Sequence, residues 1–129
     1  MKLVLDTNVW LDLLVFDDPA ARRLRGPQLE ILIDDACAAE LERVLAYPLG
    51  KWSLAPERRA ACLGECRRIA RRIEPERAAA GLPRCQDPDD QKFVELAAAA
   101  GADALVTRDA ALLRLRGRVP FRIARPAEL

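Results

Sequence analysis

KLVLDTN, over residues 2–8, joins a short apolar run to three residues that each favour the N-cap of a helix. The apolar run predicts a buried strand over residues 2–5. The polar residues after it predict that a helix follows directly, over about residues 9–16. A strand that leads straight into a helix is the repeating unit of α/β folds, and the same order recurs along the chain.

Strand and helix signals alternate after this first unit, with Gly, Pro and N-cap residues at their ends. Parallel strands joined by crossover helices, with helices on both faces of one sheet, are the arrangement that this alternation predicts. Ligands of such sheets bind beyond the carboxyl ends of the strands. We predict strands over 2–5, 30–33, 73–75, 104–106 and 121–124, helices over 9–16, 20–25, 36–46, 56–73, 87–100 and 110–115, and a loop over 76–85.

The chain of 129 residues contains no histidine, and its 21 Lys and Arg nearly balance its 20 Asp and Glu. Without imidazole, Ser-His-Asp and Cys-His catalysis, histidine general bases and almost every zinc enzyme are excluded. The chemistry left to this chain is that of carboxylates, or plain binding.

Length and composition predict one folded domain over residues 1–129. Asp6 falls inside what would be the apolar core of a signal peptide, and no apolar run approaches the ~18 residues that span a bilayer. The four cysteines lack CxxC spacing and histidine companions, so we expect buried, reduced thiols. Together these features predict a cytoplasmic protein with no membrane partner.

Acidic side chains follow the predicted strands. Asp6 comes after the first strand, Glu40 lies in the helix after the second, an acidic run over residues 87–90 opens the helix before the fourth strand, and Asp109 comes after that strand. Carboxylates that share one edge of a sheet repel one another unless a cation lies among them. Oxygen ligands without His or Cys select Mg²⁺ or Mn²⁺, which suit phosphoryl-transfer chemistry.

Each of these acids also has a purely structural interpretation. Asp6 and Asp109 are good N-caps, and Asp87 and Asp89 suit the first turn of a helix, for which capping is the stronger explanation. Glu40 could be one more solvated charge, and helical phase barely distinguishes it from Glu42. Only the joint placement of the acids favours a site.

Four motifs, in this order, resemble those of PIN-domain nucleases. The resemblance spans nearly the whole chain and is greatest to the toxins of VapC-type toxin–antitoxin pairs. LDTN alone is moderately specific, and its combination with DPDD and a strand that ends in TxD is strongly so. The motifs are Leu3-Val4-Leu5-Asp6-Thr7-Asn8-Val9, Glu40-Leu41 running to Val44-Leu45 and Pro48, Asp87-Pro88-Asp89-Asp90 with Phe93 and Leu96-Ala97, and Ala104-Leu105-Val106-Thr107-Arg108-Asp109, followed by a closing Pro126-Ala127-Glu128.

The resemblance implies an α/β/α sandwich with a five-stranded parallel sheet. It also implies a ribonuclease that depends on Mg²⁺ or Mn²⁺, forms a homodimer and is blocked by an antitoxin protein. As acids of the site, it favours Glu40 over Glu42, and Asp90 over Asp87 and Asp89. The implied catalytic and metal-binding acids are Asp6, Glu40, Asp90 and Asp109, with Asn8 and Thr107 in support and Asp87 as an assisting acid.

Basic charge is concentrated in the middle of the chain. Residues 51–85 hold nine basic and four acidic side chains, whereas residues 1–50 hold five basic and nine acidic ones. Arginine pairs suit an RNA backbone, because guanidinium binds phosphate with two hydrogen bonds. A solvated helix face with intrahelical ion pairs explains them equally well. The candidates for RNA binding are Arg67, Arg68, Arg71 and, within the TxD motif, Arg108.

Three other functions compete with a toxin nuclease. One is a PIN-type RNA-processing nuclease without an antitoxin, and another is a non-catalytic PIN-like binding module, which intact acids disfavour. A phosphatase of the haloacid dehalogenase class is remote, because it needs Asp-x-Asp-x-Thr where this chain has Asp6-Thr7-Asn8-Val9-Trp10.

Overall fold

A parallel sheet forms the centre of the computed structural model, which describes residues 1–48, 53–76 and 81–129. In this part of the chain five strands pair in the order β3-β2-β1-β4-β5, and all four pairings are parallel. The α/β class with a five-stranded parallel sheet is therefore confirmed. The strands are β1 (Lys2–Leu5), β2 (Glu30–Ile33), β3 (Ala70–Arg72), β4 (Ala104–Val106) and β5 (Arg122–Ala124).

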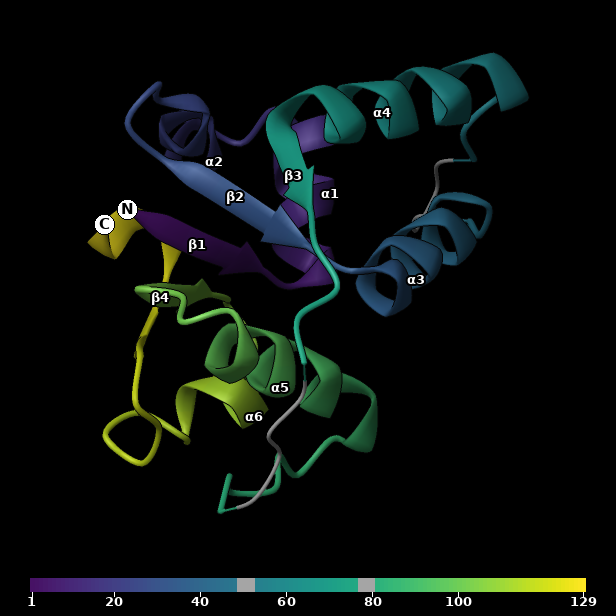
Figure 1. Ribbon diagram of the computed structural model, residues 1–129. Helices are drawn as coiled ribbons and strands as arrows, with labels where there is room; N and C mark the ends of the chain where they lie inside the picture. Colours follow the sequence, from purple (N-terminus) through teal and green to yellow (C-terminus); the bar gives the residue numbers. More distant parts are fainter. Residues whose placement is uncertain (49–52, 77–80) are drawn as a thin grey trace.

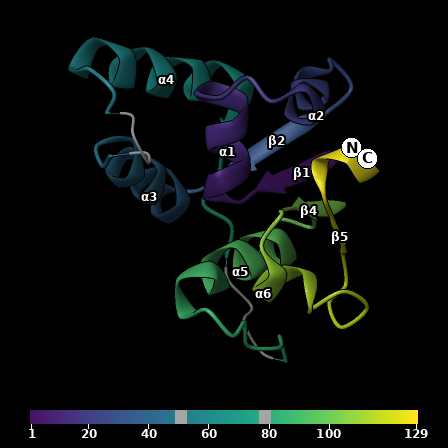
Figure 2. The ribbon, with the colours of Figure 1, turned by 180° about the vertical axis from the view of Figure 1, so that it is seen from behind.

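Helices cover both faces of the sheet. In Figure 1 α5 lies below β1 and β4 while α1 lies behind the strands, and the reverse view in Figure 2 brings α1 and α6 forward. Helices α3 and α4 lie together beyond the β2–β3 side, and the two termini lie side by side. The helices are α1 (Thr7–Leu14), α2 (Pro19–Arg22), α3 (Asp35–Leu45), α4 (Pro56–Ile69), α5 (Gln91–Ala99) and α6 (Ala110–Leu113), with 3-10 turns η1 (Arg23–Arg25), η2 (Pro88–Asp90) and η3 (Pro126–Glu128).

The edge strand corrects one prediction. We expected a helix to about residue 73 and a strand over 73–75, but α4 ends at Ile69 and β3 occupies Ala70–Arg72. Pairing with β2 explains the shift, because Ala70 aligns with Ile31 and the N–H of Ile73 donates to the Ile33 carbonyl at 2.9 Å. Tertiary pairing overrides helix propensity at this point. Part of the predicted loop, residues 77–80, lies outside the described residues.

The start of α5 differs in detail from the expected helix over 87–100. Asp87 caps a single 3-10 turn that has Pro88 in its first position, and the α-helix begins only at Gln91. The helix ends before Gly101, whose φ of 63° is a conformation that glycine adopts without strain.

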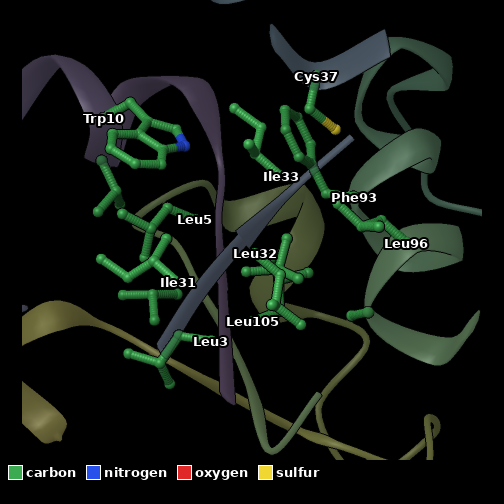
Figure 3. Packing of buried hydrophobic residues seen from close by; sticks show 14 of the residues in the cluster. Leu3, Leu5, Trp10, Ile31, Leu32, Ile33, Cys37, Phe93, Leu96 and Leu105 are labelled. Carbon is green, nitrogen blue, oxygen red and sulfur yellow. The ribbon is translucent and has the colours of Figure 1, made fainter. Parts of the chain in front are cut away.

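Alternate residues of the strands pack on opposite faces of the sheet. Leu3, Leu5 and Ile31 gather with Trp10 of α1, whereas Leu32 and Leu105 face the α5 side (Figure 3). All of these side chains are buried. No helix within the described residues is long and apolar enough to cross a membrane.

The order of the strands locates a crevice at the carboxyl ends of β1 and β4. From β1 the chain moves outward to β2 and β3, and it then returns to the other side of β1 to form β4 and β5. Helices that leave two neighbouring strands in opposite directions open such a crevice, and it is where ligands of open α/β sheets bind. Asp6 follows β1 at this point, and Asp109 follows β4.

Candidate metal centre

An acidic pocket of about 210 Å³ lies at this crevice. It brings together residues from the ends of β1 and β4, from α3 and from the turn before α5. All four acids expected from the sequence line it, as do Asn8 and the assisting acid Asp87. The full lining consists of Asp6, Thr7, Asn8, Glu40, Val44, Asp87, Asp89, Asp90 and Asp109.

Asp6 is both a helix cap and a wall of the pocket. One carboxylate oxygen accepts a hydrogen bond from the Val9 N–H at 2.9 Å, which caps α1, and the other accepts from the Thr107 hydroxyl. The side chain is only 3% exposed. Burial raises the pKa of Asp6 to about 6, the two hydrogen bonds oppose this shift, and the charge of Asp109 adds to it. Helix capping therefore explains the contact of Asp6 with Val9, but it does not explain the bond from Thr107 or the position of Asp6 in the pocket.

Thr107 lies beneath the pocket and links two of its acids. The side chain is fully buried; its hydroxyl donates to Asp6 and accepts from the backbone N–H of Asp109 at 2.9 Å. Asp109 itself caps α6 through the Ala111 N–H at 3.2 Å. The end of β1 and the end of β4 are thus held together by one hydroxyl, and this fixes the spacing of Asp6 and Asp109.

Three carboxylates converge on one point on the other side of the pocket. Asp87, Asp90 and Asp109 each place a carboxylate oxygen within 4.8 Å of the other two. Burial and the adjacent Asp109 raise the pKa of Asp90, whereas the hydrogen bond from Asp90 lowers the pKa of Asp109. Two carboxylates this close repel each other when both are ionised, so a cation between them would relieve the repulsion.

Asp90 also supplies the observation that tests whether a metal ion would fit. Its Oδ2 atom is buried and has no hydrogen-bond partner among the described residues. A buried, unpartnered carboxylate oxygen is costly unless a cation binds it. The pocket offers oxygen ligands and, among the residues lining it, no sulfur or nitrogen side chain other than the Asn8 amide. This donor set fits Mg²⁺ or Mn²⁺.

Glu40 differs from the other acids because its charge is already compensated. One of its oxygens lies 2.5 Å from the Lys92 ammonium, and the other accepts from the Thr7 hydroxyl. Lys92 also donates to the Asp89 carbonyl oxygen at 2.6 Å. The side chains of Lys92 and Glu40 are only 19% and 17% exposed.

Sequence reasoning missed the roles of Thr7 and Lys92 at this pocket. Thr7 was interpreted only as a possible N-cap, but its hydroxyl reaches across to α3. Lys92 carried a usable signal, since it lies in the first turn of α5, where the helix dipole disfavours a cation. A lysine in that position implies a nearby acid, although the sequence does not say which one.

The structure places Glu40 and Glu42 on different sides of α3. Glu40 lines the acidic pocket, whereas Glu42 is exposed and lines the surface between α3 and α4 with Leu63 and Arg67. Helical phase barely distinguished these two acids, and in the structure it is Glu40 that lies at the acidic pocket.

The candidate RNA-binding arginines do not line the described part of the acidic pocket. Arg108 is paired with Asp12 at 2.9 Å and with Asp18 at 2.7 Å, so it ties the loop after β4 to α1 and α2. Arg71 lies on β3 rather than on a helix face. The remaining contacts are those of Arg71 with Glu30, Arg68 with Glu65, and Arg67 at the surface pocket between α3 and α4.

The fold and the pocket together define a class of protein: a parallel α/β domain with an acidic site suited to a metal ion, located at the crevice between the carboxyl ends of β1 and β4. The sequence profile of the PIN domain family matches residues 2–111, which include every acid of the pocket. The chain therefore belongs to the PIN domain family, and the resemblance noted in its sequence is confirmed. No curated protein sequence matches the chain significantly.

Several solved structures share the fold, and two of them match nearly the whole of this chain. One is the crystal structure of VapBC2 from Rickettsia felis bound to a DNA fragment from their promoter, in which the matching chain has 19% sequence identity and a TM-score of 0.65. That match covers 96% of this chain and 97% of the other. The second is PAE2754 from Pyrobaculum aerophilum, with 16% identity, a TM-score of 0.60, and coverage of 99% of this chain and 85% of that one.

Proposed function

We propose that this protein is an endoribonuclease that depends on Mg²⁺ or Mn²⁺, with Asp6, Glu40, Asp90 and Asp109 as its catalytic and metal-binding acids. One observation carries the proposal: four acids from distant parts of the chain meet in one pocket, where a buried oxygen of Asp90 has no hydrogen-bond partner among the residues that the structure describes. Membership of the PIN domain family supports a hydrolase that acts on nucleic acid.

The residues of the pocket have different proposed roles. Asp90 and Asp109 present the converging oxygens that would hold the cation, Asp6 faces them from β1, and Asp87 assists from the turn before α5. Thr107 keeps Asp6 in position through its hydroxyl. A divalent cation held by these acids would activate water and neutralise charge on the phosphate. Asn8, at the rim, supplies an amide that can hydrogen-bond RNA or water.

A cleavage assay tests this activity. Purified protein should cleave RNA in the presence of Mg²⁺ or Mn²⁺, stop when EDTA is added, and resume when Mn²⁺ is restored. Asp109→Asn should remove the activity without loss of the folded state, whereas Glu57→Gln, an acid of the first turn of α4, should change nothing. Cleavage that continues in EDTA would contradict the mechanism, and intact acids without any RNA cleavage would indicate a binding module.

We further propose that the nuclease is the toxin of a toxin–antitoxin pair. The sequence motifs support this, and so does the shared fold with a chain of the VapBC2 complex. Expression should arrest growth, and co-expression of the small reading frame adjacent to the gene should relieve the arrest. A protein that cleaves RNA without arresting growth would instead be an RNA-processing nuclease.

The resemblance also supports a homodimer, and buried free cysteines at positions 37, 62, 66 and 85 are consistent with a cytoplasmic location. Sedimentation equilibrium of the purified protein should give twice the mass of the chain. A single-chain mass at micromolar concentration would contradict the proposed dimer and would leave the nuclease proposal intact.

A further inference from the structure

We infer that Lys92 restricts the acidic pocket to a single divalent cation, because it neutralises Glu40 and takes the place that a second cation would fill. The inference rests on the proposed metal-dependent function and specifies how many ions the site holds. The inference narrows the proposed set of metal-binding acids, because Glu40 then serves the site through Lys92 and is not a direct ligand of the cation. Lys92 is a positioning residue rather than a catalytic one.

The carboxylate oxygens at the two ends of the pocket differ in whether they already have a partner. At one end both Glu40 oxygens are occupied, one by Lys92 at 2.5 Å and the other by the Thr7 hydroxyl. At the other end, next to Asp109, Asp90 has a buried oxygen for which the described part of the chain offers no hydrogen-bond partner. Free ligand oxygens are therefore concentrated at the Asp90 end.

The position of Lys92 is fixed by more than one contact. Its ammonium donates to the Asp89 carbonyl oxygen at 2.6 Å and lies 5.4 Å from the centre of the Phe93 ring. The side chain is largely buried, so the charge is held next to Glu40 rather than moving freely in solvent. A lysine in the first turn of α5 acts against the helix dipole, and the acids of the pocket offset that cost.

Charge balance gives the reason for a built-in cation. Several carboxylates in one pocket repel one another, and in a two-metal site the second ion compensates the additional acids. An ammonium that contacts Glu40 at hydrogen-bond distance compensates the charge of that acid without a second metal ion. A divalent ion approaching Glu40 would have to displace Lys92 or bear its repulsion.

Isothermal titration of the metal-free protein with Mn²⁺ tests the inference without any measurement of activity. We expect one Mn²⁺ per chain for the wild type. Lys92→Gln frees Glu40 and should raise the number to two, whereas Lys92→Arg keeps the positive charge and should remain at one. The double variant E40Q/K92Q removes the freed acid and should return the number to one. Lys2→Gln, which removes an exposed lysine from β1, is the matched control and should bind as the wild type does.

Two outcomes would overturn the inference about Lys92, and a third would contradict the proposed function. Two Mn²⁺ ions in the wild type overturn the inference, even if K92Q does not fold. One Mn²⁺ in both the wild type and a folded K92Q, with equal affinity, overturns it as well, and Lys92→Met provides a second neutral variant should K92Q be unstable. Failure of the wild type to bind any Mn²⁺ contradicts the proposed function itself.

Discussion

Asp6 illustrates how one residue can serve the fold and the site in opposite ways. As the N-cap of α1 it satisfies the Val9 N–H, which stabilises the helix. As a buried carboxylate beside Asp109, it is strained electrostatically when no cation is present, and its pKa rises to about 6. The cap contributes to stability at every pH, but the charge does not.

Replacement of this charge should therefore stabilise the metal-free protein. The pKa of Asp6 is raised in the folded protein above the unfolded value of 3.8. The contribution of protonated Asp6 to the free energy of unfolding is therefore fully present below about pH 4 and is lost as the pH rises through 6. Asp6→Asn stays neutral, and its amide oxygen can still accept from the Val9 N–H. Its NH₂ group can donate to the Thr107 hydroxyl oxygen, which replaces the bond that this hydroxyl now donates to Asp6. In EDTA at pH 7.5 it should raise the free energy of unfolding by about 1–3 kcal/mol, while RNA cleavage is lost.

Urea denaturation at pH 7.5 and at pH 3.5 measures this effect. At the lower pH the wild type and Asp6→Asn should have nearly equal stability. Asp18→Asn is an opposite control, because Arg108 lowers the pKa of Asp18 and the loss of this charge should destabilise the protein at pH 7.5. An Asp6→Asn variant that is less stable than the wild type at pH 7.5 would refute the electrostatic interpretation of Asp6.

The Thr107 hydroxyl provides a second test at the scale of single residues. Thr107→Val keeps the shape of the side chain but leaves Asp6 and the Asp109 N–H without this partner. We expect stability to fall by about 1–3 kcal/mol and Mn²⁺ affinity to fall by about 10- to 100-fold. Thr107→Ser retains the hydroxyl and should recover most of the affinity in the same titration. Equal Mn²⁺ affinity in Thr107→Val and the wild type would mean that the hydroxyl does not position the acids.

At the scale of elements, local signals predicted most of the fold, and pairing between distant segments decided the rest. The strand over residues 2–5 was predictable because a buried apolar run is followed by N-caps. Strand β3 was misplaced because Ala70–Arg72 looks helical until it is paired with β2. In the same way, Arg108 looked available for phosphate until the fold brought Asp12 and Asp18 to it. A local pattern in the sequence does not identify both partners of an ion pair between distant elements.

Helix α3 offers a matched pair of variants, because Glu40 and Glu42 lie two residues apart on its different sides. Glu40→Gln removes the partner of Lys92 and leaves a largely buried cation unpaired, so both Tm and RNA cleavage should fall. We expect the loss of cleavage to exceed about tenfold. Glu42→Gln changes an exposed acid outside the pocket, and its Tm and cleavage rate should match those of the wild type. Comparable effects of the two substitutions would show that the pocket does not depend on Glu40.

At the scale of the whole molecule, the strand order explains why acids far apart in the sequence meet. The switch between β1 and β4 places Asp6 and Asp109 at one edge, and α3 and α5 add Glu40 and Asp90 from either side. Asp6 and Asp109 could be found from the sequence because each follows a predicted strand, whereas Glu40 and Asp90 were chosen over their acidic neighbours by the resemblance to PIN-domain nucleases. The division of the pocket into a compensated end at Glu40 and an open end at Asp90 depends on Lys92 and Thr7, and only the folded chain reveals it.

The most direct test of the account is the anomalous diffraction of crystals soaked in Mn²⁺. We predict one anomalous peak in the acidic pocket, bound by carboxylate oxygens of Asp90 and Asp109, with Glu40 still paired to Lys92. The same soak of Asp109→Asn crystals should show no peak there. Wild-type crystals at saturating Mn²⁺ with an empty pocket, or with Mn²⁺ bound only elsewhere, would contradict the central claim that these acids form a metal centre.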